Sequence, residues 1–162
     1  MQIPWFSTLK KIPLQILFKV SEIATQAKNL DDAYVKIHGI IKTITYAENL
    51  YIALYDKDSG WITFPYCVDE YKENTQPRQF AKGYSELVIS TEETQLINPE
   101  KAQALLNSGV VQRSAPVPNK QKATSWLGAP LKTSQGVIGL LSLIHISAPT
   151  RRYAISYAVF CL

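Results

Sequence analysis

Cysteine and histidine, the side chains that most often act as nucleophiles, bases and metal ligands, are scarce in this sequence. Its 162 residues hold two cysteines, Cys67 and Cys161, and two histidines, His38 and His145. A nucleophile needs a base beside it, and a closed structural zinc site needs four ligands. These few residues supply neither arrangement. The sequence therefore predicts no catalytic residue, no metal site and a protein that is not an enzyme.

Aromatic side chains are the second group that could do chemistry, by binding a small molecule. If residues 50 to 55 form a strand, Tyr51 and Tyr55 share one face with Ala53, while the aliphatic Leu50, Ile52 and Leu54 share the other. An aromatic cavity could lie under the first face. The side chains predicted to line it are Tyr51, Tyr55, Phe64, Tyr66, Phe80 and Tyr84. Simple core packing is the alternative explanation for the same residues, and the one we favour.

Two isolated features favour ordinary structural roles. Residues 56 to 60 begin like a calcium-binding loop, but Trp61 occupies the place of the required glycine and Cys67 that of the closing glutamate. A hairpin turn is the better interpretation. His38 lies in a predicted helix, where a surface or partly buried imidazole is favoured over haem ligation.

Composition indicates a single globular domain in a reducing, cytoplasmic compartment. Hydrophobic residues make up 46% of the chain and charged residues 19%, which allows one core. The 17 basic and 13 acidic residues are scattered, without the dense basic runs that favour nucleic-acid binding. No apolar run approaches the roughly 20 residues that span a bilayer, and the N-terminus lacks the features of a signal peptide. We therefore expect contact with neither nucleic acid nor a membrane.

A stripe of apolar residues predicts a lead-in helix over residues 14 to 29, after an N-terminal linker of residues 1 to 13. Apolar positions recur at steps of four and three up to Leu30. The stripe is either a seam with a second copy of the chain or the buried side of a helix that lies on its own domain. The residues predicted for the dimer seam are Ile16, Val20, Ile23 and Ala27.

The remaining pattern predicts an α+β domain with an antiparallel sheet. Asn29, Asp31 and Asp32 favour the start of a second helix, which Tyr34, Ile37, Ile41 and Ile44 continue at helical spacing. Two hairpins are predicted, one over 50–55 and 61–66, the other over 125–131 and 137–143. Between them we expect a polar loop over 69–79, a helix over 80–90, a strand over 94–98, a helix over 99–108 and an exposed loop over 112–122.

This order resembles that of GAF domains over residues 14 to 142, and short motifs carry the resemblance. The most specific is the pair Ser125-Trp126-Leu127-Gly128-Ala129-Pro130-Leu131 and Gly136-Val137-Ile138-Gly139-Leu140-Leu141. The others are Asn29-Leu30-Asp31-Asp32, Leu54-Tyr55-Asp56 before Gly60, and Gly83-Tyr84 before Val88-Ile89. The resemblance implies a central antiparallel sheet, terminal helices on one face that pair with a partner subunit, and a ligand cavity under the other face. Gly128 and Gly139 fit because glycine allows close backbone approach, and Pro130 suits a strand edge or bulge.

The chain is most similar to the bacterial GAF domains that precede histidine kinase or diguanylate cyclase output domains, as in two-component systems. The resemblance implies a sensor in signal transduction that binds a small molecule as a homodimer and relays its state through a dimer helix. The alternative is a ligand-free dimerisation module.

Other branches of the family find little support in the residues. Cys67 has no neighbouring histidine for bilin attachment, and Asn119-Lys120 is not followed by the residues of a cyclic GMP signature. Cys67 is also the only cysteine within the resemblance, too few for methionine sulfoxide reduction, although redox catalysis through it would predict loss of activity in Cys67→Ser. No cofactor is identified.

The end of the chain differs in character from the rest. Residues 141 to 162 resemble the conceptual translation of a sequencing-library adapter, with one departure at Ala148. We therefore expect the authentic domain to stop near Leu140, within three residues, as a C-terminally incomplete fragment followed by a non-native tail. A genuine terminal strand and helix is the alternative. Without its closing helix, this chain is expected to be poorly stable alone.

Overall fold

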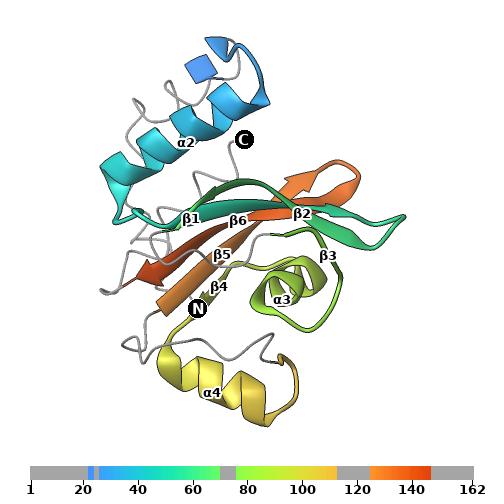
Figure 1. The fold of residues 1–162 in the computed structure, drawn as a ribbon. Coiled ribbons are helices and arrows are strands. Elements are labelled where there is room, and N and C mark those ends of the chain that lie inside the picture. The colour runs from blue at the N-terminus through green and yellow to red at the C-terminus, as the bar shows by residue number, and fades with distance from the viewer. Residues whose placement is uncertain (1–21, 24–25, 70–75, 113–124, 147–162) are drawn as a thin grey trace, which may run out of the picture.

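The structure is a computed structural model that describes residues 22–23, 26–69, 76–112 and 125–146. Their strands form one six-stranded antiparallel sheet in the order β3-β2-β1-β6-β5-β4. Helix α2 lies on one face of this sheet, and helices α3 and α4 lie on the other (Figure 1). The elements are α2 (Leu30–Ile44), β1 (Leu50–Asp56), β2 (Trp61–Val68), β3 (Arg78–Gln79), α3 (Tyr84–Thr91), β4 (Gln95–Ile97), α4 (Pro99–Asn107), β5 (Ser125–Thr133) and β6 (Gly136–Ile146). The predicted α+β class with an antiparallel sheet is confirmed.

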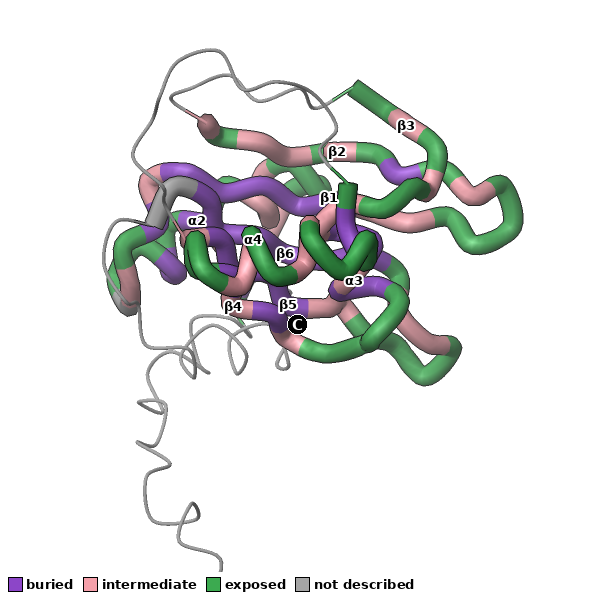
Figure 2. Tube along the Cα trace, turned by 90° about the horizontal axis from the view of Figure 1, so that it is seen from below, coloured by how far each residue is buried: buried purple, intermediate pink, exposed green. Residues whose placement is uncertain are grey.

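The sheet separates two hydrophobic clusters, because side chains alternate across each strand. The α2-face cluster is built from the buried residues Ile41, Ala47, Leu50, Ile52, Leu127, Ala129, Leu141 and Leu143. The α3-face cluster is built from the buried residues Tyr51, Ala53, Ile62, Val88, Ile89, Ile97, Trp126, Leu140 and Ile144. Figure 2 shows buried residues gathered in the central strands, whereas α4 has none that is fully buried. The predicted alternation along β1 is confirmed.

Helix α2 begins where its capping residues predict. Asn29 is the N-cap, and its side chain accepts a hydrogen bond from the Asp32 backbone N–H at 2.9 Å. Leu30 is the first residue of α2 and is 70% exposed, so the interpretation that it ends the apolar stripe of the preceding helix is wrong. The reason is the N-cap at Asn29, which makes Leu30 the first residue of a new helix instead of the last residue of the apolar stripe.

The segment before α3 departs from two predictions. Arg78 and Gln79 form the short strand β3 against β2, inside the stretch predicted as a loop. The helix predicted from Phe80 begins only at Tyr84, because the Phe80 backbone N–H donates to the Gly60 carbonyl at 2.8 Å. Phe80 is therefore held by the first hairpin instead of by helical bonds.

Gly139 and Pro130 of the second hairpin behave as predicted, whereas Gly128 makes room for the Trp126 side chain instead of for backbone. A Cβ at Gly139 would lie 3.0 Å from Leu54 Cα and would overlap the Ala53 carbonyl oxygen, so only glycine allows β1 and β6 to pair this closely here. Pro130 lies in β5 beyond the residues that pair with β4, where β5 is an edge on that side.

Strand β6 continues past the predicted domain boundary. It runs to Ile146, and both Leu141 and Leu143 are fully buried in the α2-face cluster. The boundary expected near Leu140 therefore falls inside a strand. Most of the predicted loop over 112–122, most of the lead-in helix and residues 147 to 162 lie outside the described residues.

Candidate functional site

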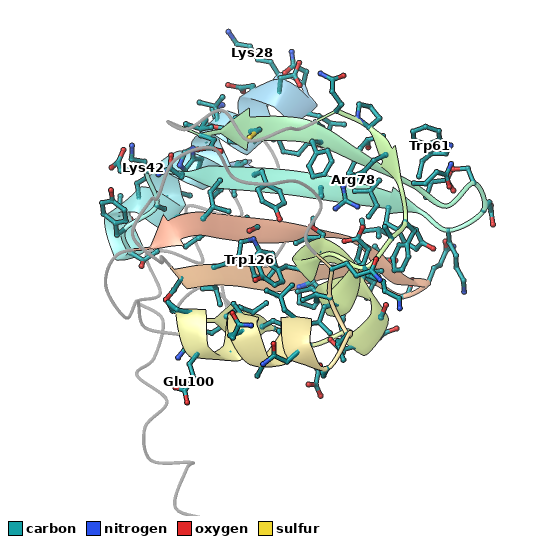
Figure 3. All side chains as sticks on the ribbon, turned by 60° about the horizontal axis from the view of Figure 1, so that its bottom comes forward. Lys28, Lys42, Trp61, Arg78, Glu100 and Trp126 are labelled. Carbon is teal, nitrogen blue, oxygen red and sulfur yellow. The ribbon has the colours of Figure 1, made fainter. Side chains whose placement is uncertain are left out.

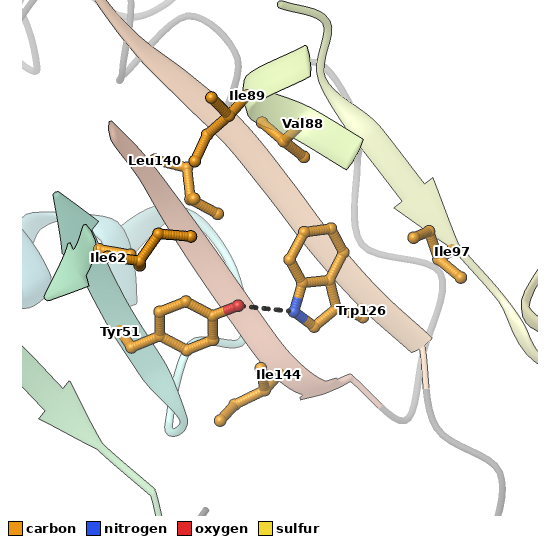
Figure 4. Close-up of a cluster of buried hydrophobic side chains, with 9 residues drawn as sticks. Tyr51, Ile62, Val88, Ile89, Ile97, Trp126, Leu140 and Ile144 are labelled. Carbon is orange, nitrogen blue, oxygen red and sulfur yellow. Dashed lines mark hydrogen bonds between the residues drawn. The ribbon is translucent and has the colours of Figure 1, made fainter. Parts of the chain in front are cut away.

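The candidate site is a hydrogen-bonded group within the α3-face cluster. The Trp126 indole Nε1–H donates to Tyr51 Oη at 3.3 Å, and Tyr51 Oη lies 3.0 Å from Ser85 Oγ (Figure 4). All three side chains are buried, and they come from β5, β1 and α3. A polar group in an apolar interior is stable only when it is paired, and here each hydroxyl and the indole N–H has a partner. The site thus brings polar atoms of three elements to one point beneath α3.

Five of the six predicted aromatic residues, Tyr51 of this group among them, lie on the same face. Tyr51 meets Phe64 with ring centroids 5.7 Å apart, Tyr55 meets Phe80 at 5.0 Å, and Tyr84 meets Trp126 at 5.4 Å. Contacts of this geometry are favourable between aromatic rings. The prediction that these residues share a face is confirmed, whereas ligand contact by them stays a prediction.

Tyr66, the sixth residue, lies on the opposite face, so its place in the predicted set is wrong. It packs against the α2-face cluster, and its ring centroid lies 6.0 Å from that of Tyr34. The cause is a bulge in β2: Ile52 pairs with Tyr66, whereas Leu54 pairs with Thr63, so β2 holds one extra residue there. An extra residue inverts the alternation beyond it, and Pro65 lies within the bulge.

Trp126, like Ser85, is a site residue that the sequence interpretation missed as a candidate. It lies two residues before Gly128, and a Cβ at Gly128 would be 2.7 Å from Trp126 Cζ3. Residues two apart in a strand point to the same face, so a bulky ring can cover the surface that a glycine leaves bare. The Trp-x-Gly spacing was therefore the available signal. Figure 3 shows Trp126 on the face of the sheet that α3 and α4 cover.

Ser142 adds a buried hydroxyl to the same face. It is fully buried, and its Oγ has no hydrogen-bond partner among the described residues. Its face follows from alternation, because Leu140 and Ile144 on either side belong to the α3-face cluster. In the sheet register Ser142 pairs with Tyr51 on one side and with Gly128 on the other.

An ion pair between the buried Glu86 and the partly exposed Arg78 fixes the start of α3 beside the site. Glu86 is 2% exposed, forms a bidentate pair with the Arg78 guanidinium, and accepts the backbone N–H groups of Ala81 and Gly83, both at 3.1 Å. Burial raises the pKa of Glu86, but the hydrogen bonds and charge of Arg78, with the backbone N–H groups, outweigh it and hold the pKa below its ordinary value. The sequence interpretation did not single out this pair.

The lowered pKa of Glu86 predicts a pH dependence of stability. Because the folded-state pKa lies below the unfolded value, the stabilisation is fully present above about pH 5 and is lost as the pH falls through the folded pKa. Urea unfolding of the unmodified chain and of Glu86→Gln at neutral and acid pH checks this. We expect the variant to lose less stability on acidification, and equal losses in the two proteins would contradict the assignment.

His38 has a structural role, as the sequence favoured. It is 5% exposed, its Nδ1 lies 2.8 Å from Tyr66 Oη, and its Nε2 lies 2.5 Å from the Ala47 carbonyl oxygen. A carbonyl only accepts, so Nε2 carries the proton and donates to it. Both ring nitrogens therefore bond within the protein, which leaves neither for the haem ligation considered above.

The described residues show few other reactive groups. Cys67, their one cysteine, lies in β2 at the margin of the α3-face cluster and is in no disulfide there. No three His, Cys, Asp or Glu side chains in the described ranges gather as a metal site would require. None of the described helices has the length and apolar character needed to cross a membrane.

The predicted dimer seam is only partly described. Ile16 and Val20 lie outside the described residues, whereas Ile23 is 7% exposed and packs with Ile40 of its own α2. Ala27 packs at the margin of the same small cluster. Ile23 and Ala27 therefore pack on their own domain, as the alternative interpretation expects. The seam interpretation is wrong for Ile23, because its own chain already covers its side chain.

Comparisons with known proteins address the fold. No protein-family model matches this sequence, and no curated protein matches it. Among solved structures, the GAF domain of a phosphoenolpyruvate-protein phosphotransferase from Acinetobacter aligns with a TM-score of 0.62 at 18% identity, covering 91% of this chain and 87% of that one. The corresponding domain from Coxiella burnetii aligns with a TM-score of 0.63 at 16% identity, covering 91% and 89%.

A third solved structure with this fold is an enzyme. The free methionine-R-sulfoxide reductase from Neisseria meningitidis, in complex with its substrate, aligns with a TM-score of 0.61 at 10% identity, covering 91% of this chain and 84% of that one. The identities are low, but the alignments span nearly the whole of each chain. The antiparallel sheet, with α2 on one face and α3 and α4 on the other, is therefore a GAF fold.

Proposed function

We propose that this chain is the sensory module of a bacterial signalling protein, binding a small molecule on the α3 face and relaying its state to helices on the α2 face. The single observation that carries the proposal is the buried group of Tyr51, Ser85 and Trp126, which joins three elements through hydrogen bonds. Hydrogen-bonding groups at the centre of an aromatic cluster are the usual means of orienting a small ligand. The Neisseria reductase with its substrate supports the proposal, because it is a protein of this fold that holds a small molecule.

The strands offer a physical route between the two faces. Tyr51 contacts Phe64 on the α3 face, and two residues further along β2 Tyr66 contacts Tyr34 and His38 of α2 on the other. The bulge that separates Phe64 from Tyr66 places consecutive parts of one strand on opposite faces. A relay also needs two states to which the ligand binds unequally. We propose that movement of Phe64 changes the position of Tyr66 and hence of α2.

The proposed output is a histidine kinase or diguanylate cyclase domain in the cytoplasm. It is controlled by how two copies of the chain are arranged relative to each other in the dimer. We propose no catalytic step for the module itself. Cys67 is half-buried, and the described part of the chain holds no second cysteine for thiol exchange. Cys67→Ser is therefore expected to leave ligand binding and stability nearly unchanged.

A thermal-shift screen of nucleotides and small metabolites tests the binding proposal. We expect at least one compound to raise the melting temperature in a concentration-dependent way, because a ligand that binds only the folded state stabilises it. Tyr51→Phe keeps the ring but removes the hydroxyl, and should reduce that shift. If no compound stabilises the unmodified chain, or if Tyr51→Phe responds as the unmodified chain does, ligand binding at this group is wrong.

A ligand-free dimerisation module is the second candidate function. The observation that favours it is the dense packing of the α3 face, where Ile62, Val88 and Leu140 are fully buried. Under this candidate the domain only holds two copies together, and the thermal-shift screen would give no stabilising compound while the chain still dimerised.

Dimerisation itself is best tested on the exposed side of α2. Val35 is 59% exposed there, so Val35→Asp should leave the fold intact and weaken dimerisation about tenfold or more by placing like charges in the interface. Val110→Asp is the matched control, because Val110 is 49% exposed after α4. Analytical ultracentrifugation should show a monomer only for Val35→Asp. An unchanged dimer would exclude this side of α2 as the interface. Ile23→Asp is unsuitable, because Ile23 is buried in its own chain.

A further inference from the structure

The Trp126 indole fills a place on the α3 face that is shaped for a flat ring. It covers Gly128, where the absence of a Cβ lets the ring lie against the backbone. Its N–H donates to Tyr51 Oη, which is backed by Ser85 Oγ, and the Tyr84 ring is tilted at 45° to it. A bare backbone floor, an aromatic wall and one oriented acceptor are the features that recognise a planar ring with an N–H group.

A buried hydroxyl that the indole cannot satisfy lies in the strand between Tyr51 and Gly128. The ring nitrogen lies at Tyr51 of β1, and ring atoms Cζ2 and Cη2 lie over Gly128 of β5. Ser142 of β6 pairs with both of these residues, so it lies between them on the same face of the sheet. A carbon edge accepts no hydrogen bond, and Ser142 Oγ is buried without a hydrogen-bond partner among the described residues. A ring with an acceptor next to its N–H would satisfy both Tyr51 and Ser142.

The surroundings favour an uncharged ring and allow Trp126 to leave. Among the described residues, Glu86 is the one buried acidic side chain, and the partly exposed Arg78 guanidinium neutralises it, so a charged ligand would be desolvated without a counter-ion. Trp126 is 8% exposed, the largest exposed fraction among the buried members of the α3-face cluster, so it is the least covered of them.

We propose that the Trp126 indole is a displaceable internal occupant of a binding site for an uncharged, planar nitrogen heterocycle. The ring N–H of the ligand donates to Tyr51 Oη, and an adjacent ring nitrogen accepts from Ser142 Oγ. This inference rests on the proposed function and specifies its ligand class and its regulation: the chain fills its own site until such a ligand displaces Trp126. The apparent affinity is then reduced by the small fraction of molecules in which Trp126 has moved out.

The two residues proposed to bond the ligand lie in different parts of the sequence. Ser142 belongs to the stretch that resembles an adapter translation, whereas Tyr51, Gly128 and Trp126 lie before it. The experiment therefore reads the Tyr51 contact and the Ser142 contact separately, by comparing three ligands of nearly equal shape. Benzofuran has no N–H, indole has the N–H alone, and 7-azaindole has the N–H and the adjacent acceptor.

The first measurement is fluorine NMR of the full chain labelled with fluorotryptophan, with 7-azaindole as the probe. Trp5→Phe and Trp61→Phe assign the three tryptophan signals. We expect the Trp126 signal to shift to saturation with added 7-azaindole, while the signal of Trp61, which is 43% exposed at the first hairpin, stays in place. A Trp126 signal that does not move at millimolar 7-azaindole would overturn the proposal, because the indole would then be a fixed part of the core.

The second measurement is calorimetry on Trp126→Ala, in which the place of the indole is vacant. We expect binding about tenfold or more tighter than to the unmodified chain. The order should be 7-azaindole, then indole, then benzofuran, each step about fivefold, as one hydrogen bond changes affinity. Adding Ser142→Ala should remove only the first step and adding Tyr51→Phe the second. Equal affinities for all three compounds would show an unselective apolar cavity and overturn the assignment.

Controls separate this inference from the function on which it rests. Trp61→Ala removes an exposed tryptophan and should bind the three compounds no more tightly than the unmodified chain does. If Trp126→Ala fails to fold, the fluorine experiment on the unmodified chain decides alone. If metabolites stabilise the chain in the thermal-shift screen while the Trp126 signal stays fixed, the proposed function stands and the displacement of Trp126 is wrong.

Discussion

Replacing Glu86 with alanine is expected to lower the free energy of unfolding by about 2–3 kcal/mol, the scale of losing hydrogen bonds to a charged, buried carboxylate while its Arg78 partner stays partly in contact with water. The substitution leaves the Arg78 guanidinium without its counter-ion and removes the acceptor of the Ala81 and Gly83 backbone N–H groups. It also removes the side chain that fixes the first turn of α3, which supplies Ser85 to the candidate site. Urea denaturation followed by circular dichroism measures the change.

The control for Glu86 is the exposed Glu100 of α4. Glu100→Ala should change stability by less than about 0.5 kcal/mol, as is usual for surface substitutions. Combining Arg78→Ala with Glu86→Ala should cost clearly less than the sum of the two single changes, because each alone leaves a partner unpaired. Additive losses, or a loss for Glu86→Ala as small as that for Glu100→Ala, would show that the pair does not hold the start of α3.

Gly139→Ala is the second substitution with a large expected effect, a loss of about 3 kcal/mol or more, at or beyond the upper end for overpacking. The added methyl group would overlap the Ala53 carbonyl oxygen and crowd Leu54 Cα, and these backbone atoms cannot move without separating β1 from β6. The two strands form the centre of the sheet, so the loss acts on both clusters. Thermal and urea unfolding both report it.

Gly39→Ala gives the matched control for this prediction. Gly39 lies within α2, and a Cβ there would meet no atom within 4 Å. The same change should therefore raise stability, by up to about 1 kcal/mol, because alanine favours the helix over glycine. If Gly39→Ala and Gly139→Ala had effects of the same sign and size, close approach of β1 and β6 would not be the reason for glycine at 139.

The sequence predicted the sheet because its strands carry strong local signals. Residues 50 to 55 alternate cleanly, and the second hairpin is marked by Gly136, whose positive φ of 116° suits glycine at the turn. Asn29 and Asn98 mark the starts of α2 and α4, and each accepts the backbone N–H three residues on. In these elements the local pattern and the tertiary packing agree, so the pattern alone was sufficient.

The parts that escaped prediction depend on contacts between distant residues. The bulge at Pro65 inverts one side chain, so Tyr66 could not be placed by counting from Tyr51. The delayed start of α3 depends on Phe80 bonding to Gly60, twenty residues earlier in the sequence. The site residues Ser85 and Trp126 meet Tyr51 across 34 and 75 residues, which no local periodicity encodes.

The adapter-like stretch is another place where the local sequence pattern was not sufficient to predict the structure. Leu141, Leu143 and Ile144 lie in the run that resembles an adapter translation, and the apolar, acid-free character of that run also favours a foreign origin, yet a strand covered on both faces requires apolar residues in succession. Composition does not distinguish these two origins. Resequencing the source locus tests the proposal that residues 141 to 162 are non-native, and an intact genomic frame through Leu162 would contradict it.

The central claim, that a small molecule binds on the α3 face and that α2 senses it, is tested most directly by backbone amide NMR. The full chain is titrated with a compound that stabilises it in the thermal-shift screen. The account predicts the largest shifts at Tyr51, Ser85 and Trp126, with smaller shifts at Tyr66 and His38 across the sheet. Shifts confined to the α2 face, or shifts at Trp126 with none at Tyr66 and His38, would contradict it.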